Sequence, residues 1–182
     1  SARELPNSRP CCAMKRRELL VLGAAGAAAL AAGGIVGALA IQSASGAGKL
    51  LSASFNDLSG RSRRLSEWQG RVVLFNFWAT WCAPCREEMP ILDASAQKHG
   101  FSAVGIGIDS ASKIREFAAN YGIRYEMLVA GVDAIQLMKA LGNSSGGLPF
   151  SLVLDRRGRV VHRKLGPLAE AELGGIVAPL LR

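Results

Sequence analysis

An apolar run that leads into a pair of cysteines dominates the middle of this sequence. Residues 71–77 read RVVLFNF, rich in Val and Phe without polar alternation, which predicts a strand buried on both faces. Cys82 and Cys85 come next as a Cys-x-x-Cys motif, and residues 83–99 have the apolar spacing of a helix. The motif alone carries little weight, but its place between a buried strand and a helix start indicates redox chemistry.

The two cysteines occupy different positions relative to that predicted helix. Cys82 stands at its start, where unpaired backbone N–H groups and the positive end of the helix dipole favour thiolate over thiol, so we expect it to be the nucleophile. Cys85 lies one turn further in and is placed to attack the mixed disulfide that Cys82 forms, which makes it the expected resolving thiol. Pro84 restricts the backbone at a helix position where a missing N–H costs little.

Other roles are conceivable for the residues around the motif. The cysteine pair could be half of a zinc site, but closed sites use four ligands, and His99 and His162 lie far apart in the sequence without a second Cys-x-x-Cys. We therefore expect no metal and no cofactor, and assign the two histidines no role. Trp78 and Trp81 could either pack in the core or present a flat apolar surface to a partner peptide.

Strands and helices alternate along the rest of the chain. After a lead-in over 55–65 and a helical turn capped by Ser66 and Gln69, strands are predicted at 103–108, 127–129, 151–154 and 160–163, and helices after Ser110, over 132–141 and over 169–181. Gly158 allows a tight reversal between the last two strands, so we expect them to pair antiparallel. The order predicts a three-layer α/β domain with a mixed sheet over residues 55–182.

The N-terminal quarter predicts a membrane or export segment. Residues 19–41 are uncharged and just long enough to cross the roughly 30 Å hydrocarbon layer as a helix. Positive charges at 15–17 precede it, and the preference for such charges on the cytoplasmic side places the chain after residue 41 outside the cytoplasm. A retained anchor is favoured over a cleaved signal, although residues 38–40 offer a cleavage site and Arg16-Arg17 resembles a twin-arginine signal. Both alternatives predict a periplasmic domain.

The flanks of this segment carry no predicted chemistry. Residues 1–18 are interpreted as a cytoplasmic tail or an upstream extension, and the adjacent Cys11 and Cys12 are poorly placed to bridge each other. Residues 42–54 are small and polar enough for a flexible linker. The net charge of +8 is divided between the first 45 residues and the remainder without a dense basic stripe, so we expect no nucleic-acid partner.

Several separated motifs resemble one known family. VVLFNFWATWCAPCREEMP, VGIGIDS and GLPFSLVLDRRGRVVHRKLGPL are similar to the TlpA/ResA-like membrane-anchored thioredoxins, over about residues 55–182. The resemblance implies a thioredoxin fold with a helix and a strand inserted between Ser110 and Leu141. It also implies that Pro149, for which the sequence alone favours an ordinary trans bond, is a cis-proline beside the cysteines. The backbone of Leu148 would then pair with an extended substrate strand. The candidate substrate-binding residues are Trp81, Ala83, Pro84, Leu148 and Pro149.

Departures from the family pattern leave the proton acceptor open. Asn76 stands where ordinary thioredoxins carry a buried Asp, and Asn cannot titrate; Ala83 stands where some relatives have Glu. Glu87 and Glu88 are the nearest carboxylates in the sequence, and we expect both to be solvated helix residues. The sequence GLPFS also differs from the commoner GxPTT, which leaves details of the substrate-binding face open.

By resemblance, the chain is expected to be an extracytoplasmic protein-disulfide reductase. Its clients would be proteins with cysteine pairs, for example in cytochrome c maturation or copper-site assembly of an oxidase, and a membrane protein of the disulfide-relay type would supply the electrons. Three alternatives stay open at this point. The chain could be a disulfide-forming oxidase, a Cu(I)-binding assembly factor that uses the same thiolates, or a peroxidase of related fold, although the Thr-x-x-Cys setting of a peroxidase is absent.

Overall fold

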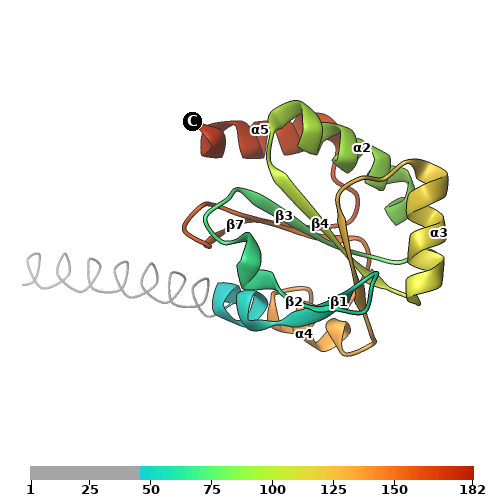
Figure 1. Ribbon diagram of the computed structural model, residues 1–182. Coiled ribbons are helices and arrows are strands. Elements are labelled where there is room, and N and C mark those ends of the chain that lie inside the picture. The colour runs from blue at the N-terminus through green and yellow to red at the C-terminus, as the bar shows by residue number, and fades with distance from the viewer. Residues whose placement is uncertain (1–45) are drawn as a thin grey trace, which may run out of the picture. The chain divides into compact units, whose positions relative to one another are not determined.

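The computed structural model describes residues 46–182, which build a seven-stranded mixed sheet with helices on both faces (Figure 1). The strand order is β2-β1-β5-β4-β3-β6-β7. Helices α2, α3 and α5 cover one face, and α4 together with residues 46–52 covers the other. The predicted three-layer α/β architecture with a mixed sheet is confirmed.

The centre of the sheet corresponds to the apolar runs of the sequence. Strands β3 (Val73–Trp78) and β4 (Ser102–Ile108) are parallel, and β4 is parallel to β5 (Glu126–Ala130). Strand β6 (Phe150–Leu154) runs antiparallel to β3 and forms a hairpin with β7 (Val160–Leu165), as predicted. Because β3 and β6 are neighbours that run in opposite directions, the last residues of β3 and the first residues of β6 lie side by side at one end of these strands.

The helices also begin and end where local signals allow. Helix α2 (Ala83–His99) ends at Gly100 in the left-handed conformation, and α3 (Ala111–Tyr121) starts after Ser110, whose hydroxyl accepts a hydrogen bond from the Lys113 N–H. The two remaining helices are α4 (Ala134–Ala140) and α5 (Glu170–Leu181). Between Ser110 and Leu141, where the family resemblance implies an inserted helix and strand, the structure has α3, β5 and α4.

The structure corrects the prediction for the segment before β3. Residues 46–52, expected within a flexible linker, are helical, and Ala47 and Leu50 are buried in the core. The lead-in is a β-hairpin of β1 (Ser54–Asp57) and β2 (Ser62–Arg64) at the sheet edge. The next helical turn is η1 (Leu65–Trp68), a 3₁₀ helix capped by Glu67, which accepts a hydrogen bond from the Arg64 N–H, rather than by Ser66 and Gln69. The packed domain therefore begins before residue 55.

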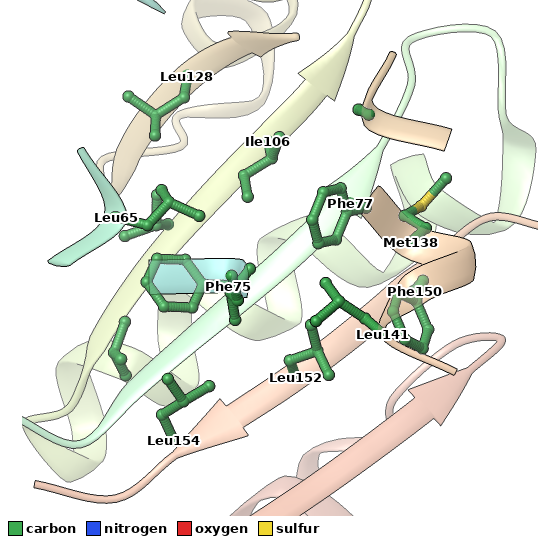
Figure 2. Close-up of a cluster of buried hydrophobic side chains, with 14 of the residues drawn as sticks. Leu65, Phe75, Phe77, Ile106, Leu128, Met138, Leu141, Phe150, Leu152 and Leu154 are labelled. Atoms are coloured by element: carbon green, nitrogen blue, oxygen red, sulfur yellow. The ribbon is translucent and has the colours of Figure 1, made fainter. Parts of the chain in front are cut away.

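One face of the sheet carries a continuous apolar core (Figure 2). Phe75 and Phe77 of β3 point to this face, where Leu152 of β6 and Met138 of α4 lie beside them. All four side chains are completely or almost completely buried. This face provides hydrophobic stability and holds α4 against the end of the sheet where β6 begins.

The predicted membrane segment cannot be compared with the structure, because residues 1–18, 19–41 and 42–45 lie outside the described residues. Between residues 46 and 182, no helix has the length and apolar character needed to cross a bilayer.

Candidate active site

The two cysteines of the motif form a disulfide at the start of α2. Cys82 is the N-cap residue of the helix, and its carbonyl accepts the hydrogen bond from the Arg86 N–H at 3.1 Å. The Cα atoms of Cys82 and Cys85 are 5.3 Å apart, the ordinary separation for a disulfide. Pro84 lies in the first turn, where its missing N–H leaves no helix hydrogen bond unmade. The predicted helix start at the motif is confirmed.

The two sulfur-bearing residues differ in exposure. Cys85 is completely buried, whereas Cys82 retains 7% of its surface and contributes to the wall of a pocket of about 370 Å³. A partner sulfur can therefore approach the disulfide from the side of Cys82. Approach from the side of Cys85 is blocked by the core residues around it, including Met89 and Trp78.

The pocket beside Cys82 gathers several of the predicted substrate-binding residues. Trp81, Pro84 and Leu148 line it together with four residues that were not predicted to bind substrate, which are Ile108, Ile135, Gly146 and Gly147. Ala83 is exposed at the helix start, and Pro149 is buried; neither contributes to the lining. The side chains at the pocket are apolar, so the surface offered next to the disulfide is apolar.

The loop before β6 has the geometry that the family resemblance implies. The Leu148–Pro149 peptide bond is cis. Phe150 pairs with Phe77 in the sheet, which brings this loop to the edge where β3 leads into the cysteine motif. The sequence alone favoured a trans bond here, so the resemblance rather than the residue pattern gave the correct prediction.

The two tryptophans near the motif have different surroundings. Trp78 is completely buried, and its ring centroid lies 4.9 Å from that of Phe117 on α3. Trp81 is 68% exposed at the rim of the pocket. Trp78 therefore packs in the core, whereas the ring of Trp81 is accessible, and its contact with a partner peptide stays a prediction.

Glu88 is a candidate site residue that the sequence analysis misjudged. Glu87 is exposed as expected, but Glu88 is only 2% exposed, so its description as a solvated helix residue is wrong. Glu88 lies three residues after Cys85 on α2, and this spacing places both on the same face of the helix. The sequence signal for the burial of Glu88 was its helical spacing from Cys85 and from Leu92, which is also buried.

Neutral hydrogen-bond donors surround the Glu88 carboxyl group. Oε1 accepts a hydrogen bond from Asn76 Nδ2 at 2.7 Å, and Oε2 accepts one from the Leu168 N–H at 2.8 Å. Burial raises the pKa of Glu88 to about 7, although these two hydrogen bonds act in the opposite direction. A carboxyl group that titrates near neutral pH can take up and release a proton beside Cys85.

A second polar contact holds the loop in front of Cys82. The Thr80 hydroxyl donates a hydrogen bond to Asp109 at the end of β4, and Asp109 also accepts one from the Ser110 N–H at 2.7 Å. Burial acts to raise the pKa of Asp109, but the hydrogen bonds from Thr80 and Ser110 and the nearby Lys113 together hold it below its ordinary value. Asp109 therefore stays ionised and ties the loop to the sheet.

Neither histidine takes part in the site. His99 is near Gly174 of α5, and His162 on β7 lies 3.8 Å from Glu172 of the same helix α5. Within residues 46–182, no three His, Cys, Asp or Glu side chains are grouped closely enough to hold a metal ion.

Comparison with known proteins agrees with this geometry. The model of the Redoxin family matches residues 46–177, which is most of the chain. The chain belongs to the Redoxin family. The match begins at residue 46, where the helical segment before β1 is already packed in the core.

Individual relatives specify the type of Redoxin protein. The chain is 30% identical over 122 residues to the thiol-disulfide oxidoreductase ResA of Geobacillus thermodenitrificans, covering 65% of this chain and 68% of the relative. It is 36% identical over 113 residues to the thiol:disulfide interchange protein HelX of Rhodobacter capsulatus, covering 62% of each. A crystal structure of a thiol:disulfide interchange protein from Chlorobium tepidum superimposes with a TM-score of 0.63 at 28% identity, over 72% of this chain and 94% of that one.

These findings confirm three expectations from the sequence. The fold is that of thioredoxin, the resemblance to TlpA/ResA-like proteins holds, and the chain is a thiol-disulfide oxidoreductase.

Proposed function

We propose that this protein reduces disulfides of client proteins, with Cys82 as nucleophile and Cys85 as resolving thiol. The difference in exposure between the two cysteines carries this assignment, because only Cys82 contributes to the open pocket while Cys85 is enclosed by the core. The helix N-terminus at Cys82 favours its thiolate in the reduced protein.

The proposed reaction is a two-step exchange that starts from the reduced protein. The Cys82 thiolate attacks one sulfur of the client disulfide, which forms a mixed disulfide and releases the other client sulfur as a thiolate. Cys85 then loses its proton to the Glu88 carboxylate and attacks the Cys82 sulfur. The client leaves as two thiolates that take up one proton from Glu88 and one from water, and the protein keeps the Cys82–Cys85 disulfide that the structure describes. An electron donor must then return two electrons.

Glu88 is the proposed proton acceptor for Cys85. It is buried on the same helix face one turn away, and its raised pKa of about 7 leaves it partly ionised at neutral pH. This role fills the place of the buried Asp of ordinary thioredoxins, which Asn76 cannot fill because an amide does not titrate.

The apolar pocket beside Cys82 and the loop before β6 supply the proposed client-binding surface. Trp81 and Pro84 line one side of the pocket, with Ala83 exposed beside them at the helix start, and the backbone of Leu148 next to Pro149 would pair with an extended segment of the client. An unfolded or extended client fits this arrangement best, because the segment must reach a sulfur on the pocket wall.

The cellular setting is part of the proposal. The apolar residues 19–41, with positive charges before them, would anchor or export the chain and place the domain in the periplasm. The proposed clients are proteins with cysteine pairs in cytochrome c maturation or in copper-site assembly, and the proposed electron donor is a membrane protein of the disulfide-relay type. The relatives named oxidoreductase ResA and interchange protein HelX support this choice of reaction.

Trapping of mixed disulfides tests the assignment of roles. The Cys85→Ser variant retains the nucleophile but cannot resolve the mixed disulfide, so clients should accumulate on Cys82 and can be identified by mass spectrometry. Cys82→Ser is the matched control and should trap little. Equal or better trapping by Cys82→Ser would reverse the two roles.

The redox potential tests the direction of electron flow. A reductase should have a potential near the thioredoxin end of the range of roughly −270 to −120 mV, whereas a potential at the upper end indicates a disulfide-forming oxidase. Equilibration of the purified protein with glutathione buffers gives this value.

A further inference from the structure

Three groups from separate parts of the chain form a hydrogen-bond network with the buried carboxyl of Glu88. Asn76 on β3 donates both hydrogens of its side-chain amide, one to Glu88 Oε1 at 2.7 Å and one to Ser151 Oγ at 3.0 Å. Asn76 and Ser151 are directly paired residues of the neighbouring strands β3 and β6. The Leu168 N–H donates to the other carboxyl oxygen at 2.8 Å. The side chains of Asn76, Glu88 and Ser151 are all at least nine-tenths buried.

This arrangement of donors suits an ionised Glu88. Each carboxylate oxygen accepts one hydrogen bond, and the Ser151 hydroxyl serves as an acceptor for the second amide hydrogen. The amide oxygen, Asn76 Oδ1, is buried without a hydrogen-bond partner within the described residues. A buried amide oxygen without a partner is costly, which suggests that this side chain serves more than one state of the site.

Uptake of a proton by Glu88 changes which orientation of the amide is satisfied. A proton on Oε2 would face the fixed Leu168 N–H, a second donor, so it is better placed on Oε1. There it faces the Asn76 NH₂, again a donor, unless the amide turns by 180°. After the turn, Oδ1 accepts hydrogen bonds from both the Glu88 O–H and the Ser151 O–H, since a hydroxyl can donate as well as accept. Both contacts are then kept with their direction reversed.

We propose that Asn76 is a positioning residue whose side-chain amide turns over when Glu88 gains or loses a proton, with the Ser151 hydroxyl reversing its hydrogen bond at the same time. The inference rests on the proposed role of Glu88 as proton acceptor for Cys85. An amide at position 76 gives both protonation states of Glu88 the same number of hydrogen bonds and does not itself titrate.

The other titratable groups near Glu88 do not offer an alternative partner for its proton. Cys85 on α2 is held in the disulfide. Burial, followed by the charges of Glu88 and Asp93, raises the pKa of Tyr125 well above its ordinary value, so this phenol stays neutral. Asp93 itself accepts hydrogen bonds from Arg124 and from the Tyr125 N–H. Lys164, paired with Ser151 on β7, is bound to Glu172 at 2.9 Å.

Nuclear magnetic resonance of the full chain in its disulfide form tests the proposal directly. With labelled Asn and Glu, the Glu88 carboxyl carbon reports its protonation, and the Asn76 side chain reports its hydrogen bonds. As the pH falls through the midpoint of Glu88, the NH₂ signals should shift toward those of an unbonded amide and the side-chain carbonyl carbon should shift as it becomes an acceptor. Asn76 signals that stay unchanged while Glu88 titrates would overturn the proposal.

Variants provide a second, independent measurement. Asn76→Leu has a side chain of similar size without donors or acceptors, so both protonation states of Glu88 lose a hydrogen bond, and the Glu88 midpoint should move by less than about one pH unit, a tenfold change in proton affinity. Ser95→Ala removes another buried hydroxyl of α2 and is the matched control, with no shift expected. A rise of more than about one pH unit in folded Asn76→Leu would show that Asn76 stabilises the ionised form alone as a fixed donor, and would also overturn the proposal.

A separate measurement, the release of trapped clients, tests the proposed role of Glu88 as proton acceptor. If Glu88→Gln released trapped clients as fast as the wild type, Glu88 would not be the proton acceptor, whatever the amide signals show. If release slowed in Glu88→Gln but the amide signals did not respond to pH, Asn76 would be a fixed donor, and only the inference about its turning would be lost.

Discussion

The two faces of the central sheet use the same strands for different purposes. Strand β3 sends Phe75 and Phe77 to one face and Asn76 to the other, and its neighbour β6 sends Leu152 to the first face and Ser151 to the second. The face toward α4 is entirely apolar at these positions, whereas the face toward α2 carries the polar group that holds Glu88. Because successive side chains of a strand point to opposite faces, the same two strands supply apolar side chains to the core and polar side chains to the Glu88 site.

The polar groups on the α2 face make this face contribute less to stability than the α4 face. Burial of apolar side chains stabilises the α4 face by roughly 25 cal/mol per Å² of surface removed from water. Burial of Glu88 has the opposite effect when the group is ionised, because it raises its pKa to about 7 without a cationic partner among its hydrogen-bond donors. Substitutions on the α4 face should therefore change stability at every pH, whereas those at Glu88 should change how stability depends on pH.

Truncation of a buried side chain on the α4 face should have the largest effect, and it should change only the free energy of unfolding. Phe75→Ala removes a completely buried ring that contacts Trp68, so we expect a loss of about 3–5 kcal/mol in the free energy of unfolding. Urea unfolding measures this loss. The exchange rate per folded molecule should stay within about twofold of the wild type, since the ring points away from α2. A comparable loss of exchange in fully folded protein would show that the faces are coupled.

Glu88 should make stability depend on pH on the other face. Its pKa is about 7 when folded and 4.5 ordinarily, so between these values the unfolded chain loses its proton before the folded one does. The contribution of Glu88 is therefore fully present below pH 4.5 and is lost as the pH rises to about 7, by about 3 kcal/mol.

The Glu88→Gln variant isolates this effect because its amide does not titrate. Relative to this variant, the wild type should become less stable between pH 4.5 and 7, as measured by urea unfolding of the disulfide form at several pH values. Glu87→Gln is the matched control, since Glu87 is exposed on the same helix, and should show no such change. A constant difference between wild type and Glu88→Gln would mean that Glu88 has an ordinary pKa.

Most of the central fold was predictable because its signals are local. Strand β3 is a long apolar run, and the cysteine motif opens α2, so periodicity and position identified both elements. The hairpin of β1 and β2 has strands of four and three residues with exposed polar side chains, which leaves little periodicity to detect. Residues 46–52 look like a linker in composition, but Leu50 is buried by contacts with residues distant in sequence.

The site divides in the same way between local and distant signals. Cys82, Cys85 and Trp81 were identified because their surroundings are set by the helix start. Glu88 was missed because its burial depends on Asn76, 12 residues earlier, and on the Leu168 N–H, 80 residues later. A single charged residue on a helix gives no sign of such partners, since most are solvated.

Overpacking beside Asn76 should have an intermediate effect and reach the site. Gly105 on β4 pairs with Asn76, and a Cβ atom there would lie 2.7 Å from Met127 Sδ and 3.0 Å from Trp78 Nε1. We expect Gly105→Ala to cost about 1–3 kcal/mol in urea unfolding. Because Trp78 packs in the same cluster as both cysteines, its fluorescence should also respond differently to reduction of the disulfide. An unchanged response would show that Trp78 is not displaced.

The loop contact in front of Cys82 should give the smallest effect. Thr80→Val keeps the shape of the side chain but removes the hydrogen bond to Asp109, so we expect a loss of about 1 kcal/mol in the free energy of unfolding at neutral pH. The pKa of Asp109 lies below its ordinary 3.8, so the stability from its ionised form is present above that value and is lost as the pH falls through the lower pKa of the folded state. The difference between variant and wild type should therefore shrink in strong acid.

Ser112→Ala, an exposed change on the neighbouring helix, is the control. A Thr80→Val difference that persisted unchanged in acid would assign the effect to packing rather than to the charged hydrogen bond.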